Sequence, residues 1–215
     1  MSILFFDIET MPTKDPEIIK QISETIKPPG NIKKTESIAA WMDEKFNQAL
    51  IDAVKETSLD GLYGGVACIG WSYGDGEVSS SGLNQTEAET IKEFYGCIVR
   101  DVTKFCGHNI QNFDLQFLKH RSIILGIRPP NNLLMAMNAK PWSDWVADTM
   151  IMWDSSKQNM VSMYRLCKAF GIDGKGDFNG SMVAETWEKD PQKVIEYCLD
   201  DVRRTMQIYK RMTFE

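Results

Sequence analysis

Two carboxylates near the start of the chain are the first residues whose types and spacing could do chemistry. Asp7 and Glu9 follow the apolar run Ile3–Phe6 in the segment FFDIET. Side chains two residues apart on a strand point to the same face, so these two carboxylates are expected side by side, with Phe6 and Ile8 facing the core. Adjacent carboxylates repel unless a cation lies between them, and their oxygens suit Mg²⁺ or Mn²⁺. An acidic strand end exposed to water is the alternative interpretation.

Two further motifs carry acids at helical positions. In GHNIQNFD, Asn112 is expected to cap a helix over 112–125 and to place Asp114 in its first turn, where the helix dipole alone favours a carboxylate. In YCLDD, Tyr197 and Asp201 are four residues apart on a predicted helix over 192–212, so they share one face. Asp200 lies on a different side and is expected to be solvated. Each of these motifs is weak by itself.

The elements that must position these residues alternate between strands and helices. We expect the first strand at Ser2–Asp7 and helices at 12–60, where Asp15 and Pro16 start one helix and Thr35 caps a second. Further expected elements are a hairpin of Gly65–Tyr73 with Glu77–Ser80, helical periodicity over 86–102, strands at Phe105–Asn109 and Val146–Met150, a loop or insertion at 128–141, a helix at Met160–Phe170 and a glycine-rich loop at 171–180. This pattern predicts an α/β fold with a mixed central sheet flanked by helices. The helices at 12–60 form an insertion after the first strand.

Composition and charge restrict the class of protein. The chain has 215 residues, with 24 Lys and Arg against 30 Asp and Glu, and a net charge of −6. One domain spanning 1–215 is expected. Its apolar runs are too short for a membrane helix, it begins without a secretory signal, and its five scattered cysteines indicate reduced thiols in the cytoplasm. The acidity argues against a protein that coats nucleic acid by bulk positive charge.

Together, the three motifs resemble the DnaQ-like, or DEDD, 3′–5′ exonuclease superfamily. Its members carry D-x-E on the first strand, an Asp at the start of a central helix, and a Tyr or His shortly before an Asp on the last helix. GHNIQNFDLQFL and YCLDDV resemble the exonuclease domain of family B DNA polymerases. The segments around KKTESIAAWMDEK and at 175–205 resemble related stand-alone predicted exonucleases of bacteria and phages. Glu196 stands where the histidine subclass carries its histidine, so the likeness is to the tyrosine subclass, DEDDy.

The resemblance implies an RNase H-like fold and hydrolysis of single-stranded DNA from its 3′ end, with release of nucleoside 5′-monophosphates in a bacterial cell or a phage-infected host. It implies two divalent cations, Mg²⁺ or Mn²⁺, held by Asp7, Glu9, Asp114 and Asp201. Tyr197 would orient the attacking water rather than accept its proton, because the ordinary pKa of tyrosine is near 10. Two bound ions would change the net charge from −6 to about −2.

By the same resemblance, Thr10 and Met11 would contact the 3′-terminal nucleotide. The strand's path would be lined by Asn109, Asn112 and Phe113, where Phe113 either stacks on a base or packs into the core. Lys175, like Lys27, Lys33 and Lys34, could contact phosphates, and a solvated lysine is the alternative. Asp148 is a candidate for an outer position around the metals.

Two other functions stay open at this point. RNA 3′-end trimming uses the same type of site, and nothing in the sequence reports recognition of a 2′-hydroxyl. A non-catalytic RNase H-like module that binds nucleic acid or a replication partner is the second alternative. Proofreading during DNA replication or repair would need a polymerase in trans, so a replication or recombination protein is a further expected partner.

Overall fold

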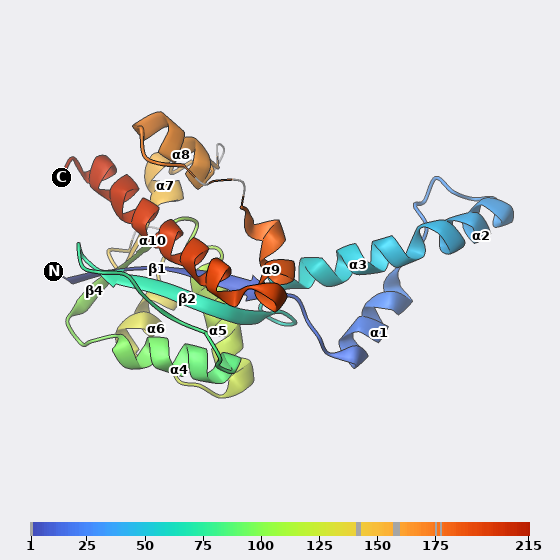
Figure 1. The fold of residues 1–215 in the computed structure, drawn as a ribbon, viewed down its shortest axis with the longest axis horizontal. Helices are drawn as coiled ribbons and strands as arrows, with labels where there is room; N and C mark the ends of the chain where they lie inside the picture. Colours follow the sequence, from blue (N-terminus) through green and yellow to red (C-terminus); the bar gives the residue numbers. More distant parts are fainter. Residues whose placement is uncertain (1, 141–142, 157–159, 175, 177) are drawn as a thin grey trace.

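The computed structural model describes residues 2–140, 143–156, 160–174, 176 and 178–215. Its centre is a five-stranded sheet in the order β3-β2-β1-β4-β5 (Figure 1). β1 (Ser2–Met11) pairs antiparallel with β2 (Gly65–Tyr73), which pairs antiparallel with β3 (Ser79–Ser81). On its other side β1 pairs parallel with β4 (Val102–Gly107), and β4 pairs parallel with β5 (Val146–Asp148). The predicted mixed sheet is confirmed.

Helices cover both faces of the sheet. The long helix α10 (Pro191–Thr213) crosses one face, accompanied by α7 (Thr149–Trp153), α8 (Met163–Phe170) and α9 (Val183–Lys189) (Figure 1). The opposite face carries α4 (Glu87–Cys97), α5 (Asp114–Leu125) and α6 (Asn131–Met137). None of the helices in the described part of the chain combines the length and hydropathy needed to cross a bilayer.

Side chains along β1 alternate between the two faces of the sheet, so the acidic ones lie on the face opposite to Phe6. Phe6 is buried on the α4 side, where its ring lies 5.2 Å from that of Phe94 between the ring centroids. Phe5 points the other way and packs edge-on against Tyr209 of α10, at 5.5 Å. Because strand side chains alternate, the odd-numbered Asp7 shares the face of Phe5. The acidic side chains of β1 are therefore presented to α10 rather than to the larger hydrophobic core.

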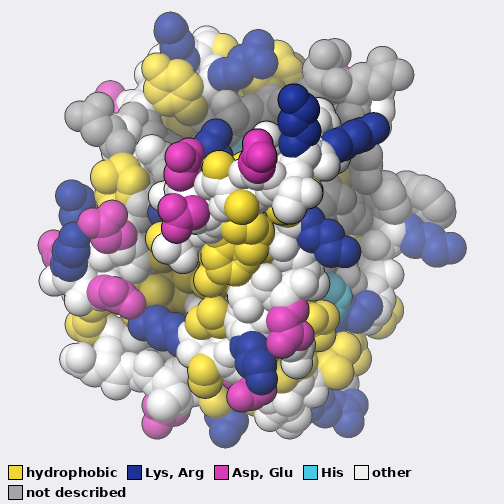
Figure 2. Space-filling view, turned by 90° about the vertical axis from the view of Figure 1, so that its right-hand side faces the viewer, with side chains coloured by type: hydrophobic (Ala, Val, Ile, Leu, Met, Phe, Trp, Pro, Cys, Tyr) yellow, Lys and Arg dark blue, Asp and Glu magenta, His cyan; other side chains and the backbone are white. Residues whose placement is uncertain are grey.

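Between β1 and β2 the chain forms a projecting helical arm, which we define as α1 (Pro16–Thr25), α2 (Thr35–Glu44) and α3 (Phe46–Glu56) (Figure 1). None of these three helices contains a buried residue. The face seen from the side of the arm carries acidic and basic side chains interspersed around a strip of hydrophobic ones (Figure 2). The arm is thus held by its own packing and by its base.

Two predictions about this arm have different outcomes. The helix start at Asp15 is confirmed, because the Asp15 carboxylate accepts a hydrogen bond from the Glu17 amide at 2.8 Å. The prediction that Thr35 caps the second helix is wrong: Lys34 is the N-cap, and Thr35 lies inside the helix. The helix is also interrupted at Lys45, whose φ of −121° departs from helical geometry.

Elsewhere, side-chain caps decide where elements begin. The predicted Asn112 cap of α5 is wrong, because the N-cap is Phe113 and the Asn112 amide donates instead to Asn109 Oδ1 at 3.2 Å. The strand predicted to reach Met150 ends at Asp148, whose carboxylate accepts from the Met150 amide at 3.0 Å and starts α7. Helices α6 and α9 were not anticipated as helices from the sequence.

Candidate metal centre

Three carboxylates from two distant elements meet on the α10 face of the sheet. Asp7 and Glu9 of β1 and Asp201 of α10 each offer an oxygen atom, and these atoms all lie within 4.8 Å of one another. Glu9 is 8% exposed and Asp201 only 4% exposed. Like charges this close and this buried are costly unless a cation joins them, and an all-oxygen donor set suits Mg²⁺ or Mn²⁺. The donor set fits a divalent metal centre.

A glycine in β2 allows α10 to approach so closely. Gly70 lies opposite Asp7 in the sheet register, and a Cβ atom built on it would stand 3.2 Å from Cys198 Sγ and 3.3 Å from Val202 Cγ2. Cys198 in turn directs its thiol to the Asp7 carbonyl oxygen, at 3.4 Å. Burial raises the pKa of Cys198 well above its usual range, so this thiol stays protonated beside the acids. The packing of α10 on β2 therefore sets the distance between Asp201 and β1.

Asp114 lies beside this cluster, at the first turn of α5. It is 3% exposed, and its Oδ1 atom accepts a hydrogen bond from the Ile8 amide, between the two acids of β1, at 3.1 Å. Burial, with smaller contributions from the nearby carboxylates of Asp148 and Asp201, raises the pKa of Asp114 to about 7. A cation would favour its ionised form. Asp114 is thus placed to serve as a fourth carboxylate at the edge of the site.

The Asp201 carboxylate is held in place by an arginine one turn further along α10. Arg204 Nη1 lies 2.9 Å from Asp201 Oδ1, and the same guanidinium donates to the carbonyl oxygens of Asp173 and Gly174 at 3.3 and 3.4 Å. Arg204 thereby connects a metal-ligand candidate to the glycine-rich segment. Sequence analysis missed this residue, although the i, i+3 spacing on a predicted helix was a usable signal. Asp200 instead forms a half-exposed ion pair with Arg203 at 2.7 Å.

Tyr197 stands one turn before Asp201 on α10 and is partly exposed. Its ring packs against Phe178, with 4.8 Å between the ring centroids. The Lys193 ammonium lies over the same Phe178 ring, 5.6 Å from its centre, and Phe178 also packs against the hydrophobic cluster that contains Cys198. Phe178 therefore limits the orientations open to Tyr197. No sequence signal identified Phe178, because it lies in an aperiodic, glycine-rich stretch.

Of the predicted substrate contacts, Thr10 and Met11 at the end of β1 and Phe113 before α5 also have structural roles. The Thr10 hydroxyl donates to the Ser58 carbonyl oxygen at 2.7 Å, which fastens the base of the arm. Met11 is partly buried against the hydrophobic cluster formed by α9 and α10. Phe113 packs partly into the core with its ring 5.7 Å from that of Phe117, as the core-packing interpretation expects.

The loop before α5 is braced by Asp148. This buried carboxylate accepts hydrogen bonds from the amides of Asn109 at 2.9 Å and Gln111 at 3.0 Å. Asn109 adopts a positive φ of 62°, and the Asn112 side chain is exposed beside it. Asp148 thus positions the loop rather than joining the carboxylate cluster. Of the predicted phosphate contacts, Lys175 lies outside the described residues, and Lys27, Lys33 and Lys34 are exposed between α1 and α2 on the arm.

Comparison with known proteins bears on the family and on the fold. A family model described as predicted 3′–5′ exonucleases related to the exonuclease domain of PolB matches residues 66–215. The matched part contains Asp114, Tyr197 and Asp201, whereas Asp7 and Glu9 precede it. No curated protein matches the sequence significantly.

Among solved structures, the family B DNA polymerase from the hyperthermophilic archaeon Pyrobaculum calidifontis is similar, with a TM-score of 0.64 at 18% sequence identity. The similarity covers 99% of this chain and 24% of the polymerase, so the chain spans about a quarter of that protein's length. The likeness is one of fold, and it confirms the predicted RNase H-like α/β class.

Proposed function

Because the chain belongs to the family of predicted 3′–5′ exonucleases related to the exonuclease domain of PolB, we propose that it hydrolyses single-stranded DNA from the 3′ end and releases nucleoside 5′-monophosphates. The observation that carries this proposal is the cluster of Asp7, Glu9 and Asp201 oxygens within 4.8 Å. Asp7 and Glu9 lie outside the part matched by the family model, so the geometry of the cluster supports the activity independently of that match.

In this proposal the four carboxylates hold two Mg²⁺ or Mn²⁺ ions. Asp7, Glu9 and Asp201 would hold one ion, and Asp7 with Asp114 would hold the other. Ions held in this way lower the pKa of a bound water and stabilise the leaving oxygen of a phosphodiester. The site is of the DEDDy type, with Tyr197 as its fifth residue.

The protein's own groups then have distinct tasks. Tyr197 offers a hydroxyl on the same face of α10 as Asp201, and it orients the attacking water by a hydrogen bond. Arg204 keeps the Asp201 carboxylate aimed at β1. Thr10 and Met11 at the end of β1, with Asn109, Asn112 and Phe113 before α5, are the proposed contacts of the DNA strand, and Lys175 is a proposed phosphate contact.

The direct test is digestion of single-stranded DNA and RNA labelled at the 3′ or 5′ end, with Mg²⁺ or Mn²⁺ present. We expect mononucleotide release from DNA 3′ ends, with the 5′ label retained on progressively shorter fragments. Absence of mononucleotide products from the purified protein would contradict the enzymatic proposal. Efficient cleavage of RNA with poor cleavage of DNA would instead establish the exoribonuclease alternative.

Removing the metal, or one of its proposed ligands, tests whether the carboxylates serve catalysis rather than folding. With excess EDTA, or in Asp7→Asn, we expect release to fall by at least about 10³-fold while the far-UV circular dichroism is kept. Added Mg²⁺ should raise the Tm of the unmodified protein but not of Asp7→Asn. Asp43→Asn, an exposed acid on the arm, is the matched control and should behave like the unmodified protein. Retained activity in Asp7→Asn would show that the metal assignment is wrong.

A further inference from the structure

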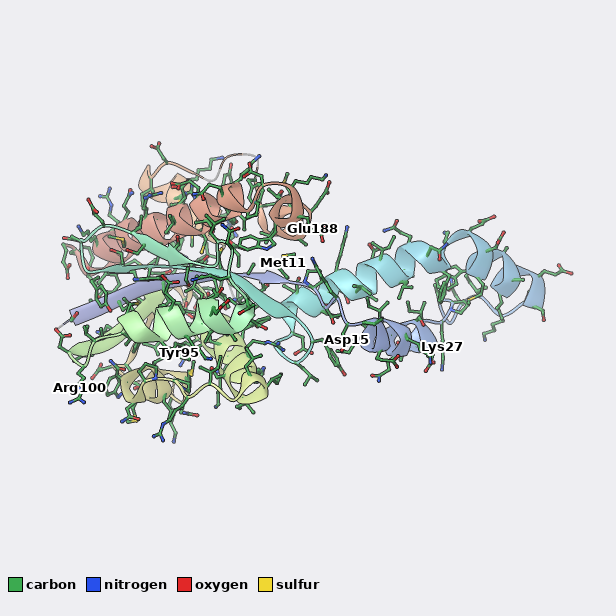
Figure 3. All side chains as sticks on the ribbon, turned by 60° about the horizontal axis from the view of Figure 1, so that its bottom comes forward. Met11, Asp15, Lys27, Tyr95, Arg100 and Glu188 are labelled. Carbon is green, nitrogen blue, oxygen red and sulfur yellow. The ribbon has the colours of Figure 1, made fainter. Side chains whose placement is uncertain are left out.

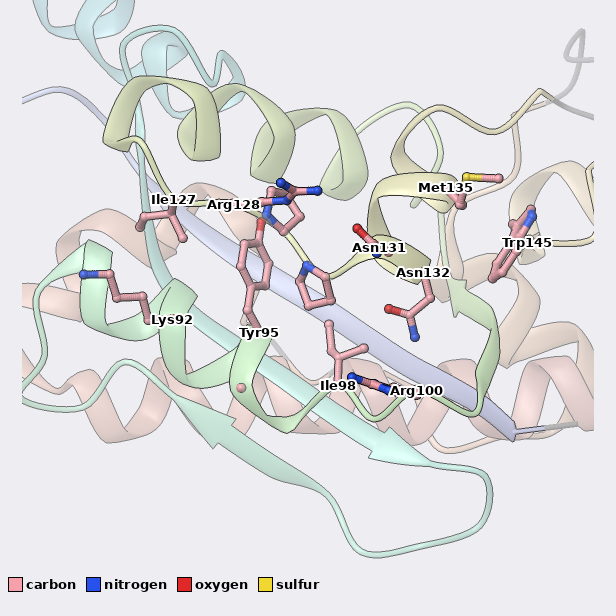
Figure 4. Close-up of a pocket in the computed structure, with 13 residues that line it drawn as sticks. Lys92, Tyr95, Ile98, Arg100, Ile127, Arg128, Asn131, Asn132, Met135 and Trp145 are labelled. Carbon is pink, nitrogen blue, oxygen red and sulfur yellow. The ribbon is translucent and has the colours of Figure 1, made fainter.

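A second hollow lies away from the carboxylates, between α4 and α6. It has a volume of about 1120 Å³ and is formed by the C-terminal half of α4, the connection to β4, the connection between α5 and α6, and the start of α6 (Figure 4). β4 begins where β1 begins, since Ser2 pairs with Val102. Asp7 stands five residues further along β1, roughly 17 Å away at the usual strand rise. Figure 3 shows Arg100 and Met11 at opposite ends of the body. An occupant of this hollow would leave the metal centre open.

The charge of the hollow is opposite to that of the protein. Three exposed cations line it, namely Lys92, Arg100 and Arg128. Among the described residues, no acidic side chain belongs to its lining, although acids outnumber bases by 30 to 24 in the chain. Within the described part of the chain, none of these three cations forms an ion pair with a carboxylate. The hollow therefore offers an acidic ligand positive charge without a direct carboxylate partner, although Glu89 lies within electrostatic reach of Lys92.

Apolar and amide side chains complete the lining. The apolar ones include Ile98, which lies beside Arg100 in Figure 4, and Met135 and Trp145, which lie on the far side of Asn131 and Asn132 in that view. Arginine, methionine and tryptophan are the residue types that protein interfaces favour in their buried centres. The hollow is also wide and open at the surface, which suits an extended chain segment better than an enclosed small molecule.

We propose that this hollow binds an acidic segment of a partner protein, with carboxylates facing Lys92, Arg100 and Arg128 and apolar side chains packing against Met135 and Trp145. Nucleic acid fits less well, because single strands bind through successive exposed aromatic faces, and of the two aromatic residues in the described lining only Trp145 is partly exposed. Tyr95, which also lines the hollow, is only 6% exposed and spends its hydroxyl on Ser122 at 2.6 Å. Binding here would recruit the protein to its partner without occupying the carboxylate site.

The test is fluorescence anisotropy with a labelled synthetic peptide of repeated Asp-Leu-Asp, measured on the full chain. We expect micromolar binding that weakens at least tenfold in Arg100→Glu/Arg128→Glu and, to a smaller extent, in Lys92→Glu. The matched control is Lys20→Glu/Lys168→Glu, which makes the same change in net charge at exposed lysines elsewhere and should bind as the unmodified protein does. Asp7→Asn should bind the peptide as the unmodified protein does. Peptide binding therefore tests this proposal even if the proposed nuclease function proves wrong.

Three results of the peptide measurements would each overturn the proposal. The first is no binding of the peptide to the unmodified protein. The second is equal binding of a matched Asn-Leu-Asn peptide, which would show that binding does not depend on the negative charge of the peptide. The third is unchanged peptide affinity in both the double variant and Lys92→Glu. Labelled oligo-dT is measured in parallel. If only oligo-dT loses affinity in the double variant, the hollow is a nucleic-acid surface and the protein-partner proposal fails.

Discussion

At the residue scale, the carboxylate cluster combines burial with mutual repulsion. Glu9, Asp114 and Asp201 are all less than a tenth exposed, and each has another acid nearby. An ionised carboxylate in such surroundings loses hydration and gains repulsion, so its charge needs compensation. Arg204 supplies part of that compensation to Asp201 at 2.9 Å. The rest is what a bound divalent cation would provide.

Tyr197 is the residue whose role is most sharply testable at this scale. In Tyr197→Phe the ring keeps its packing against Phe178 but loses its hydroxyl. We expect kcat for nucleotide release to fall roughly 10²-fold while Mg²⁺ affinity, measured by calorimetry, is unchanged. Tyr164→Phe, at a half-exposed tyrosine of α8, is the control and should keep the full rate. An unchanged rate in Tyr197→Phe would remove the hydroxyl from the mechanism.

At the element scale, the close packing of α10 on β2 brings Asp201 within reach of the acids of β1. In Gly70→Val the new side chain would meet Cys198, Leu199 and Val202, with the Cβ alone at 3.2–3.3 Å from them. We expect α10 to shift away from the sheet, the free energy of unfolding to fall by about 1–3 kcal/mol, and Mg²⁺ affinity to fall at least tenfold. Calorimetric Mg²⁺ titration and urea unfolding measure these two effects.

The control for that substitution is Gly96→Val in α4, where nothing lies within 4 Å of the new Cβ. It introduces the same side chain in open space, so Mg²⁺ affinity should not change. Normal Mg²⁺ affinity in Gly70→Val would show that the position of α10 does not depend on this close contact.

Contact between α4 and α5 has a pH-dependent component. Burial raises the pKa of Tyr95 to about 12, whereas the Tyr95 hydroxyl bonds to that of Ser122 at 2.6 Å. A raised pKa in the folded state means that stability falls as pH rises, beginning near the ordinary tyrosine pKa of 10. Because Tyr95 ionises more readily in the unfolded state, we expect it to lower the free energy of unfolding by about 1.4 kcal/mol at pH 11. Urea unfolding between pH 8 and 11 measures the loss.

Tyr95→Phe isolates that contribution. At pH 8 it should lower the free energy of unfolding by about 1–2 kcal/mol, because Ser122 loses its partner. Between pH 10 and 11 the gap between the variant and the unmodified protein should narrow, since the variant has no hydroxyl to ionise. A gap that stays constant over this range would contradict the assignment of the raised pKa to Tyr95.

At the scale of the whole molecule, the sheet with its flanking helices and the projecting arm contribute differently to stability. No residue of α1, α2 or α3 is buried, whereas the base of the arm is fastened by a hydrogen bond from the Thr13 amide to Thr57 Oγ1 at 2.9 Å. Lys14, at the base, also pairs with Glu188 of α9 at 3.0 Å. The ends of the arm are thus adjacent and tied to the sheet.

Deletion of the arm is therefore expected to leave the rest folded. Replacing residues 16–55 by a short Gly-Ser linker should change the free energy of unfolding by less than about 1 kcal/mol, because none of the deleted residues is buried. Urea unfolding followed by tryptophan fluorescence measures this, with Mg²⁺-dependent Tm as a second readout. Loss of a cooperative transition would mean that the arm stabilises the sheet.

Much of the fold and part of the site could be predicted from local sequence patterns. Alternation along FFDIET places Asp7 and Glu9 on one face, because strand side chains have a period of two. Helical periodicity similarly predicts α10 and the shared face of Tyr197 and Asp201. Prediction failed at Thr35 and Asn112, where a residue type that suits a cap lay one position from the actual N-cap.

What the sequence by itself determined was the set of reactive groups and the face of each element on which they stand, because those depend on periods of two and 3.6 residues. Only the tertiary structure decided that Asp201 of α10 meets Asp7 on the face of the sheet that α10 covers, that Gly70 makes room for α10, and that Phe178 and Arg204 orient their neighbours. These contacts join residues far apart along the chain or in aperiodic segments. They depend on how side-chain shapes fill the space between packed elements, which no local period encodes.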